Sequence, residues 1–329
     1  MLSPADRPLH ELRIELLQKC TLACVHCSAE SSPASTRSLS HDLVIRILRE
    51  GKALGLQSVV FTGGEPLIEF NLTNYVSEAH KLGIRSTIFT AGFLQEQTCA
   101  NKIAELAEVG LQQVNVSLYS IDPNINARIT RKPESMRLSQ NVLKAAIYNR
   151  LVAEVHFVPM SPNIEHLEGV AAWAEDNGIS TLSILKYVPQ GRGRIARDTL
   201  TPAPTDERRL RDRIEKIIVK HPKLKIHVGP SFSFLGLSQP TPCESGFSTL
   251  SIRSDGLVFP CDAFKGILDS QFLKNGSTRL DISMHSLADV WRSCPYLCAV
   301  RGFINEHTKP GAIRCADGCV SQTIYQKAL

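Results

Sequence analysis

Short apolar runs and longer amphipathic segments alternate along the first two thirds of this 329-residue chain. The apolar runs are typical of buried strands, and the segments between them repeat apolar residues with the spacing of a helix. The predicted strands cover residues 12–18, 58–62, 85–90, 113–118, 154–159 and 181–188. The predicted helices cover residues 39–54, 72–82, 98–109, 136–149, 164–177 and 205–220. The pattern therefore predicts a series of strand–helix units.

Such alternation requires parallel strands covered by helices, because each helix must return the chain to the same edge of the sheet. The pattern by itself allows both a doubly wound sheet and an open barrel. In either fold, functional residues gather at the carboxyl ends of the strands. Four features fall there: a cysteine loop after the first strand, residues 63–66 (G-G-E-P), residues 90–92 (T-A-G) and Ser117. Their shared position predicts one functional site.

The last third of the chain differs in character. After Pro230 the helical periodicity fades and turn residues become frequent. Residues 249–253 and 257–260 flank an Asp-Gly turn and predict a β-hairpin, and residues 286–293 predict a short helix. Six of the ten cysteines lie in this part. The predicted organisation is a tail at 1–11, an α/β domain at 12–228 and a small cysteine-rich α+β domain at 229–329.

Composition and charge indicate a cellular compartment and argue against one class of partner. The polar, proline-containing start lacks the basic and then apolar stretches of a secretory signal, and no run of apolar residues is long enough to span a membrane. We therefore expect a cytoplasmic protein, in which the cysteines serve as metal ligands rather than disulfides. The net charge of +5 is mild, and the sequence lacks the dense basic stripe that is typical of nucleic-acid binding.

The most informative motif is the C-x3-C-x2-C loop of Cys20, Cys24 and Cys27. Three thiolates can bind three corners of a cubane iron–sulfur cluster and leave the fourth iron open to a small molecule. A zinc knuckle or a reducible thiol group is the alternative, since His26 could complete a zinc set. His26 stands between Cys24 and Cys27, and this short loop makes it difficult for all of these side chains to bind one metal ion. The spacing therefore favours a cluster.

The cysteine loop and the 63–66 segment together resemble the signature of the radical S-adenosylmethionine (SAM) superfamily, and the resemblance covers nearly the whole chain. It implies a partial (β/α)6, TIM-like barrel. It also implies a [4Fe–4S] cluster on the three loop cysteines, with SAM bound at the open iron. In this family the reduced cluster cleaves SAM to methionine and a 5′-deoxyadenosyl radical, which abstracts hydrogen from the substrate. An electron donor of the flavodoxin or ferredoxin type is implied as a partner.

The resemblance also implies a set of SAM-binding residues. The turn formed by Gly63, Gly64, Glu65 and Pro66 would meet the SAM amino group. Ser117 matches a serine that contacts the SAM ribose or carboxylate, and His26 would pack near the adenine. An arginine that pairs with the carboxylate is expected about a dozen residues after the serine, where Arg131 is favoured over Arg128. The 90–92 segment has alanine where related proteins often have asparagine, so that side-chain role is absent.

The C-terminal region resembles a SPASM/twitch auxiliary-cluster domain. Cys243, Gly256 and Cys261 fit its opening half, and Cys315 and Cys319 fit its closing C-x3-C, although a full SPASM domain has seven cysteines here. The resemblance implies one auxiliary [4Fe–4S] cluster on Cys243, Cys261, Cys315 and Cys319. A second auxiliary cluster that uses Cys294 and Cys298 is the alternative, and two structural thiols are the remaining interpretation. Cys99, among apolar neighbours, is predicted to be a core thiol.

Enzymes with this architecture are often peptide maturases, so the leading hypothesis is a radical SAM enzyme that crosslinks, oxidises or epimerises a ribosomally made peptide. With about eleven residues before the first strand, we expect any leader peptide to be read by the barrel, the auxiliary domain or a separate protein. The alternatives are a dehydrogenase or mutase acting on a small metabolite or nucleoside, and a non-catalytic iron–sulfur redox sensor. Arg192 or Arg194 is a candidate to hold an acidic substrate group, and Tyr187 and Asp262 are near plausible catalytic positions.

Overall fold

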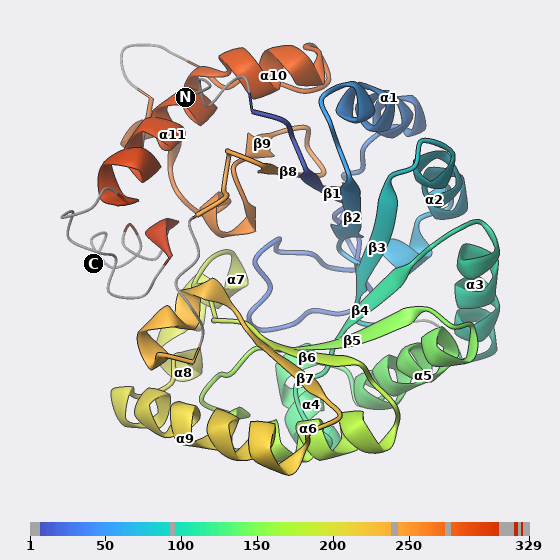
Figure 1. The fold of residues 1–329 in the computed structure, drawn as a ribbon, viewed down its shortest axis with the longest axis vertical. Coiled ribbons are helices and arrows are strands. Elements are labelled where there is room, and N and C mark those ends of the chain that lie inside the picture. The colour runs from blue at the N-terminus through green and yellow to red at the C-terminus, as the bar shows by residue number, and fades with distance from the viewer. Residues whose placement is uncertain are drawn as a thin grey trace.

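The computed structural model describes residues 7–92, 96–237, 243–273, 278–308, 319–321 and 324. Across these residues, nine strands form one sheet in the order β7-β6-β5-β4-β3-β2-β1-β8-β9 (Figure 1). Strands β1 to β7 are parallel and follow one another in chain order. The sheet curves without closing, because β7 and β9 form its two edges. The predicted α/β fold with a partial, TIM-like barrel is confirmed.

The strands are β1 (Glu11–Leu17), β2 (Ser58–Gly63), β3 (Arg85–Thr90), β4 (Gln113–Ser117), β5 (Val152–Phe157), β6 (Thr181–Ile184), β7 (Lys225–Val228), β8 (Thr249–Ile252) and β9 (Val258–Phe259). The helices are α1 (His41–Ala53), α2 (Leu72–Lys81), α3 (Glu96–Glu108), α4 (Pro123–Thr130), α5 (Ser135–Tyr148), α6 (Leu167–Asp176), α7 (Arg192–Ile195), α8 (Arg197–Leu200), α9 (Pro204–Lys220), α10 (Leu287–Ser293) and α11 (Pro295–Thr308).

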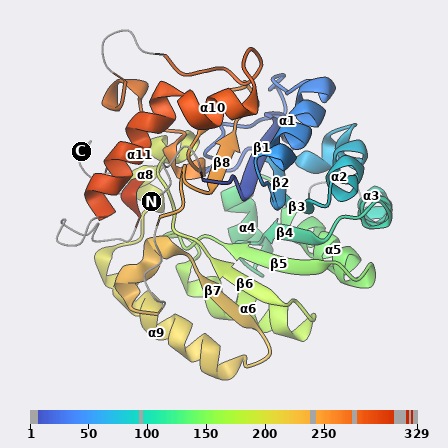
Figure 2. The same ribbon diagram turned by 45° about the horizontal axis from the view of Figure 1, so that its top comes forward.

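The long helices cover the outside of the curved sheet (Figure 2). Helix α1 illustrates why: Ser40 caps its first turn by accepting a hydrogen bond from the Leu43 amide, and its apolar stripe is buried at Val44, Ile47 and Leu48. The six helices predicted from periodicity are all present with shifted ends, and helix α6 follows a separate short turn at Ile164–His166. No helix in the described ranges is both long and apolar enough to cross a membrane.

Several elements were missed by the sequence analysis. Strand β7 and helices α4, α7, α8 and α11 have no predicted counterpart. Most are short, so their hydrophobic pattern does not complete enough periods to stand out. Helix α4 has local start signals, since Pro123 stands in its first turn and the Asp122 carboxylate accepts a hydrogen bond from the Asn124 amide. Of these elements, α4 and α7 contact the cysteine loop of the site described below.

The predicted hairpin is confirmed as β8 and β9, which pair antiparallel. The hairpin is part of the barrel sheet, because β8 also pairs with β1 in parallel and extends that sheet. The hydrophobic core is continuous across this junction: Leu12 of β1, Ile252 of β8 and Trp291 of α10 belong to one buried cluster. The predicted boundary after residue 228 therefore separates two parts of the sequence that share one sheet and one core.

Candidate active site

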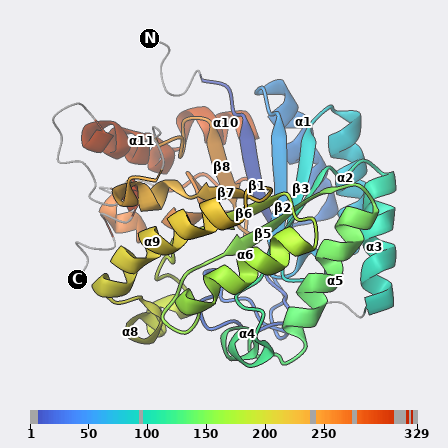
Figure 3. The same cartoon turned by 60° about the horizontal axis from the view of Figure 1, so that its bottom comes forward.

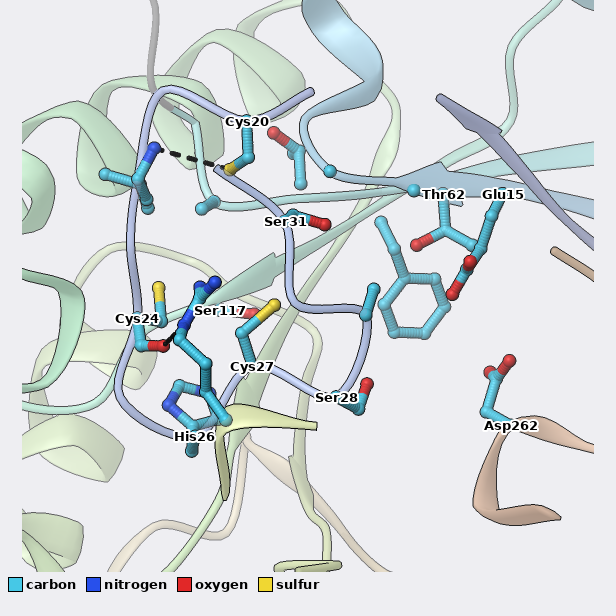
Figure 4. A pocket seen from close by; sticks show the side chains of 18 of the residues that line it. Glu15, Cys20, Cys24, His26, Cys27, Ser28, Ser31, Thr62, Ser117 and Asp262 are labelled. Carbon is cyan, nitrogen blue, oxygen red and sulfur yellow. Dashed lines mark hydrogen bonds between the residues drawn. The ribbon is translucent and has the colours of Figure 1, made fainter. Parts of the chain in front are cut away.

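A cavity of about 250 Å³ opens at the carboxyl ends of β1 to β4. Figure 4 shows the three loop cysteines on one side of it, with Glu15 and Asp262 on the other. Its wall combines sulfur, hydroxyl and charged groups with exposed backbone. The described lining residues include Glu15, Cys20, Cys24, His26, Cys27, Ser28, Thr62, Gly63, Gly64, Phe89, Thr90, Ala91, Ser117, Tyr119, Arg192, Asp262 and Lys265. The structure thus brings together the strand-end features that the sequence predicts.

The three loop thiols lie close together, and the pKa of Cys20 and that of Cys24 both respond to the neighbouring thiols. Burial, and then the neighbouring thiols of Cys27 and Cys20, hold the pKa of Cys24 above its usual range. Burial, and then the charge of Glu65, raises the pKa of Cys20 to about 12. Deprotonating these thiols together therefore requires a bound cation, as at a metal centre. This chemistry fits a group that supplies positive charge to each sulfur.

A single metal ion fits the loop poorly. No three His, Cys, Asp or Glu side chains in the described ranges are placed to hold one metal ion. A zinc ion would need every ligand within about 2.3 Å of one point, whereas each cysteine of a cubane cluster binds its own iron. The arrangement of Cys20, Cys24 and Cys27 therefore fits a cluster better than a zinc knuckle.

Backbone hydrogen bonds from two distant elements position the cysteine loop. The amides of Ala23 and Val25 donate to the carbonyls of Thr130 and Ile129 at the end of α4, at 3.4 and 2.9 Å. On the other side, the Arg192 amide donates to the Cys27 carbonyl at 3.0 Å. The Arg192 side chain adds a bond from Nε to the Cys24 carbonyl at 2.9 Å. The loop is thus held between α4 and α7.

The two glycines of the 63–66 segment permit a close backbone contact. A side chain on Gly64 would lie 2.0 Å from the Lys19 carbonyl oxygen, and one on Gly63 would lie 2.3 Å from that of Leu17. The Gly64 amide donates to the Leu17 carbonyl at 2.7 Å. These glycines therefore allow β2 to run against the chain that enters the cysteine loop, while their other side lines the cavity.

Glu65 occupies a different position from the one expected of a cofactor contact. Its side chain is fully buried and is not among the described lining residues of the cavity. Its Oε1 accepts hydrogen bonds from the Leu67 amide at 3.1 Å and the Thr90 hydroxyl at 2.5 Å. Its Oε2 accepts one from the Ala91 amide at 3.0 Å. Glu65 therefore joins the loops that follow β2 and β3 and fixes two walls of the cavity.

His26 and Ser117 both line the cavity, as predicted for SAM contacts. The His26 ring shares a 2.9 Å hydrogen bond with the Tyr119 hydroxyl, and the two rings meet edge to face. Burial, and then the charge of Arg192, lowers the pKa of His26 to about 4, so its ring is neutral at pH 7. The sequence analysis missed Tyr119. Its position two residues after Ser117, just after the same predicted strand, could have indicated that it lies near the site.

The structure does not place Arg131 with these residues. Arg131 is exposed and lines a separate hollow at the end of α4, together with Arg128. Neither arginine is among the described residues that line the cysteine cavity. The prediction that one of them pairs with a cofactor carboxylate there is therefore not supported. Arg131 ends α4 in the left-handed conformation, and its amide donates a hydrogen bond to the Ala127 carbonyl.

The wall opposite the cysteines contains a buried ion-pair network. Lys265 pairs with Glu15 of β1 and lies 2.6 Å from an oxygen of Asp262, which also contacts Arg13 at 3.3 Å. Burial disfavours the charge of Lys265, but Asp262 and Glu15 outweigh it and raise its pKa above the usual range. The sequence analysis named Asp262 but missed Glu15 and Lys265. Tyr187, the other catalytic candidate, donates its hydroxyl hydrogen bond to the Gly193 carbonyl.

A second cavity of about 490 Å³ lies inside the barrel toward the amino ends of the strands. Phe89 lines both cavities and stands between them. Most of the remaining wall consists of neutral polar side chains and a few charged ones. They include Arg13, Gln113, Asn115, Glu154, His156, Ser183 and His227. The concave face of the sheet is thus polar well below the cysteine cavity.

The C-terminal cysteines fall into two groups. Cys243, Cys261 and Cys319 form the first group. Burial raises the pKa of Cys243, with a smaller contribution from Cys319, and burial followed by Cys319 raises the pKa of Cys261 to about 12. Cys294 and Cys298 lie on α10–α11 beside Arg301, whose guanidinium is coupled to both. Cys315 lies outside the described residues, so its predicted place with the first group has no structural description.

Comparisons with known proteins agree with this geometry. The family model of the radical SAM superfamily matches residues 14–174, which include the three loop cysteines and the 63–66 segment. The chain belongs to the radical SAM superfamily. Its members use a [4Fe–4S] cluster and SAM, so these are the cofactors of this protein.

Two relatives found by sequence have the same name. A probable GTP 3′,8-cyclase of Sulfurisphaera tokodaii is 26% identical over 79% of this chain and 83% of its own length. A probable GTP 3′,8-cyclase of Saccharolobus islandicus is 27% identical over 70% of this chain and 73% of its own. At 26% and 27% identity, these names describe the relatives and do not assign their substrate to this chain.

Among solved structures, Streptococcus suis SuiB bound to S-adenosylmethionine has a TM-score of 0.76 at 21% identity and covers 98% of this chain and 75% of its own. The structure of anSMEcpe with bound AdoMet has a TM-score of 0.67 at 15% identity. The match covers 92% of this chain and 81% of the anSMEcpe chain. These likenesses show that the fold described above is the radical SAM fold.

Proposed function

We propose that Cys20, Cys24 and Cys27 hold the [4Fe–4S] cluster of this radical SAM enzyme. Their convergence on one cavity and the raised pKa of the Cys20 and Cys24 thiols carry the assignment. When bound, the cluster and SAM supply a 5′-deoxyadenosyl radical that abstracts hydrogen from the substrate. The backbone of Gly63 and Gly64, the Ser117 hydroxyl and the neutral ring of His26 line the place for SAM. Glu65 and the adjacent Pro66 position that backbone from the buried side.

The proposed substrate is a ribosomally made peptide. The SuiB structure with its bound precursor peptide SuiA has a TM-score of 0.70 at 21% identity and covers 91% of this chain. The polar cavity beyond Phe89 adds room for residues that flank a modified position. Its amide and hydroxyl side chains, among them Gln113, Asn115 and Ser183, suit hydrogen bonding to a peptide backbone.

Cyclisation of a nucleoside triphosphate is the second candidate, which the curated relatives favour. The charge of the cysteine cavity argues against it. Among the described lining residues, Lys265 is paired with Glu15 and Asp262, which leaves Arg192 as the cation without a carboxylate partner. A triphosphate carries several negative charges and normally requires several free cations or a metal ion. This balance of charge supports an uncharged or mildly charged substrate.

Two assays with the anaerobically reconstituted enzyme test the function. In the first, dithionite and SAM are added, and we expect 5′-deoxyadenosine and methionine; their absence would overturn the assignment of a radical SAM reaction in favour of a redox sensor. In the second, the enzyme is co-expressed with short peptides encoded beside its gene, and peptide masses are measured. Loss of a pair of hydrogens, or exchange of deuterium from the solvent, would support the peptide substrate. Consumption of GTP with no change in any peptide would overturn it.

We further propose that the C-terminal region is a SPASM/twitch-like unit with one auxiliary [4Fe–4S] cluster. Cys243, Cys261 and Cys319, whose thiols are coupled, would be three of its ligands. Cys315 is the expected fourth ligand from the sequence pattern. The adjacent wall formed by Asp262 and Lys265 would bring this cluster near the substrate.

The separation of the two cysteine groups leads to a prediction for Cys294 and Cys298. The double variant Cys294→Ala, Cys298→Ala should retain the iron and sulfide content of the parent enzyme. Both thiols lie beside Arg301, whereas Cys319 lies close enough to Cys243 and Cys261 to raise their pKa. Iron and acid-labile sulfide analysis after anaerobic purification provides the measurement, with Cys243→Ala, Cys261→Ala as the matched control that loses iron. A loss of four irons in the first variant would instead establish a second auxiliary cluster there.

A further inference from the structure

The end of helix α4 carries a cationic hollow on the outside of the barrel. The hollow has a volume of about 490 Å³ and is lined by Asn124, Ala127, Arg128, Arg131, Lys132 and Pro133. Arg128 and Arg131 are exposed, and Lys132 is half-buried. Three cations thus occur within five consecutive residues around one surface depression.

These three cations have no acidic partner in the described ranges. Within the described ranges, the charged groups of Arg128, Arg131 and Lys132 make no ion pair. The backbone of Lys132 is hydrogen-bonded to the Thr130 and Ser135 hydroxyls. By contrast, Arg213 and Arg279 each contact a carboxylate. Two carboxylates flank the hollow in sequence, but Asp122 caps α4 by accepting from the Asn124 amide, and Glu134 precedes α5. The positive charge of the hollow is therefore uncompensated and faces solvent. Such a patch attracts an acidic macromolecule and speeds its association.

The hollow lies directly behind the cysteine loop. Residues 128–132 include the two carbonyls, of Ile129 and Thr130, that accept hydrogen bonds from the Val25 and Ala23 amides of that loop. Figure 3 shows α4 at the rim of the barrel beside the loop that follows β1. One hydrogen-bonded layer of backbone therefore separates the cationic surface from the segment that contains Cys24.

We propose that this hollow is the docking surface for an acidic one-electron carrier protein of the flavodoxin type. The inference rests on the assignment of the cluster to Cys20, Cys24 and Cys27, which needs an electron from outside the enzyme. On docking, the reduced carrier is oxidised by one electron and the enzyme is reduced by one, with no bond formed or broken between the proteins. The charge of Arg128, Arg131 and Lys132 selects an acidic carrier, and the contact between α4 and the loop places it near the cluster.

The charge of Arg131 can be removed without straining the backbone. It ends α4 in the left-handed conformation, with φ of 64°, which glycine adopts more readily than any other residue. Replacing Arg131 with glycine removes the charge without straining the backbone, so the melting temperature should not fall. Weaker docking in this variant would therefore reflect the lost charge rather than partial unfolding.

The experiment compares the parent enzyme with the triple variant Arg128→Gln, Arg131→Gly, Lys132→Gln. Binding of oxidised flavodoxin is measured by calorimetry at low and high salt, and SAM cleavage is measured with either reduced flavodoxin or dithionite as the electron source. We expect about tenfold weaker binding at low salt and a similar loss of flavodoxin-supported cleavage below saturation. Dithionite-supported cleavage should stay unchanged. A matched control, Arg208→Gln, Lys216→Gln, Lys220→Gln, removes three exposed cations from α9 and should change neither measurement.

Two results would overturn the docking proposal. The first is unchanged flavodoxin affinity in the triple variant, which would mean that the carrier docks elsewhere. The second is an equal loss of cleavage with flavodoxin and with dithionite, which would assign the arginines to SAM binding. Absence of cleavage by the parent enzyme with dithionite would instead contradict the proposed radical SAM reaction, and the binding measurement still tests the docking surface in that case.

Discussion

Replacing Cys24 with alanine is expected to remove the N-terminal cluster and reduce SAM cleavage by at least a factor of about a thousand. Cys24 is half-buried in the middle of the loop and lies close to both Cys20 and Cys27, so its loss leaves only two ligands for the cluster. Two thiolates cannot hold a cubane against hydrolysis while an iron remains open to SAM. Without that open iron, no electron reaches the sulfonium group.

The measurement combines iron analysis with the yield of 5′-deoxyadenosine under dithionite. Cys99→Ala is the matched control, because Cys99 is 1% exposed on α3 and belongs to the hydrophobic core. This control should keep all of its iron and lose only about 1 kcal/mol of stability. If Cys24→Ala kept its full iron content and cleaved SAM, the assignment of the cluster to the loop would be wrong.

Replacing Glu65 with alanine is expected to lower the free energy of unfolding by about 3 kcal/mol. The buried carboxylate accepts hydrogen bonds from the Leu67 amide, the Thr90 hydroxyl and the Ala91 amide. Alanine would leave these donors without an acceptor in a site that excludes water, and unsatisfied buried donors are costly. The variant should also weaken SAM binding, because the loops after β2 and β3 form two walls of the cavity.

Urea denaturation of the apo-protein, with unchanged m-value, measures the loss of stability, and calorimetry of the reconstituted enzyme measures SAM affinity. Glu69→Ala is the matched control, since Glu69 is half-buried and its Oε1 accepts the Asn71 amide at 3.1 Å. It should cost about 0.5–1 kcal/mol. If Glu65→Ala were no more destabilising than Glu69→Ala while SAM binding was lost, Glu65 would be a direct ligand of SAM, as the sequence predicts.

Most of the barrel could be predicted from the sequence because its helices are long and amphipathic. Helix α1 shows a clear apolar stripe and a serine cap, and both appear in the structure. Strand β7 and helix α4 were missed because each completes only about one or two periods of its pattern. The pairing of β8 with β1 could not be predicted, since it is a long-range contact that no local pattern records.

In the candidate site, too, local motifs could be read from the sequence, whereas contacts between distant residues could not. The C-x3-C-x2-C loop and the G-G-E-P segment identified the cavity, because their residue types and spacing state the chemistry directly. The protein contacts of Glu65 and Arg131 could not be read from the sequence. Nothing local in the sequence indicates that Glu65 points away from the cavity toward Thr90, or that the turn at Arg131 directs that side chain outward.

By itself, the sequence determined the class of this protein: an α/β barrel with a cysteine loop that belongs to a radical SAM enzyme. Those properties depend on periodicity and on closely spaced motifs, which local chain chemistry records. The tertiary structure alone decided which residues meet, including Lys265 with Glu15, Arg192 with the cysteine loop and the three cations behind it. These contacts join residues that are far apart in the chain, and their energies depend on burial and charge that arise only when the sheet has curved and its strand ends have converged.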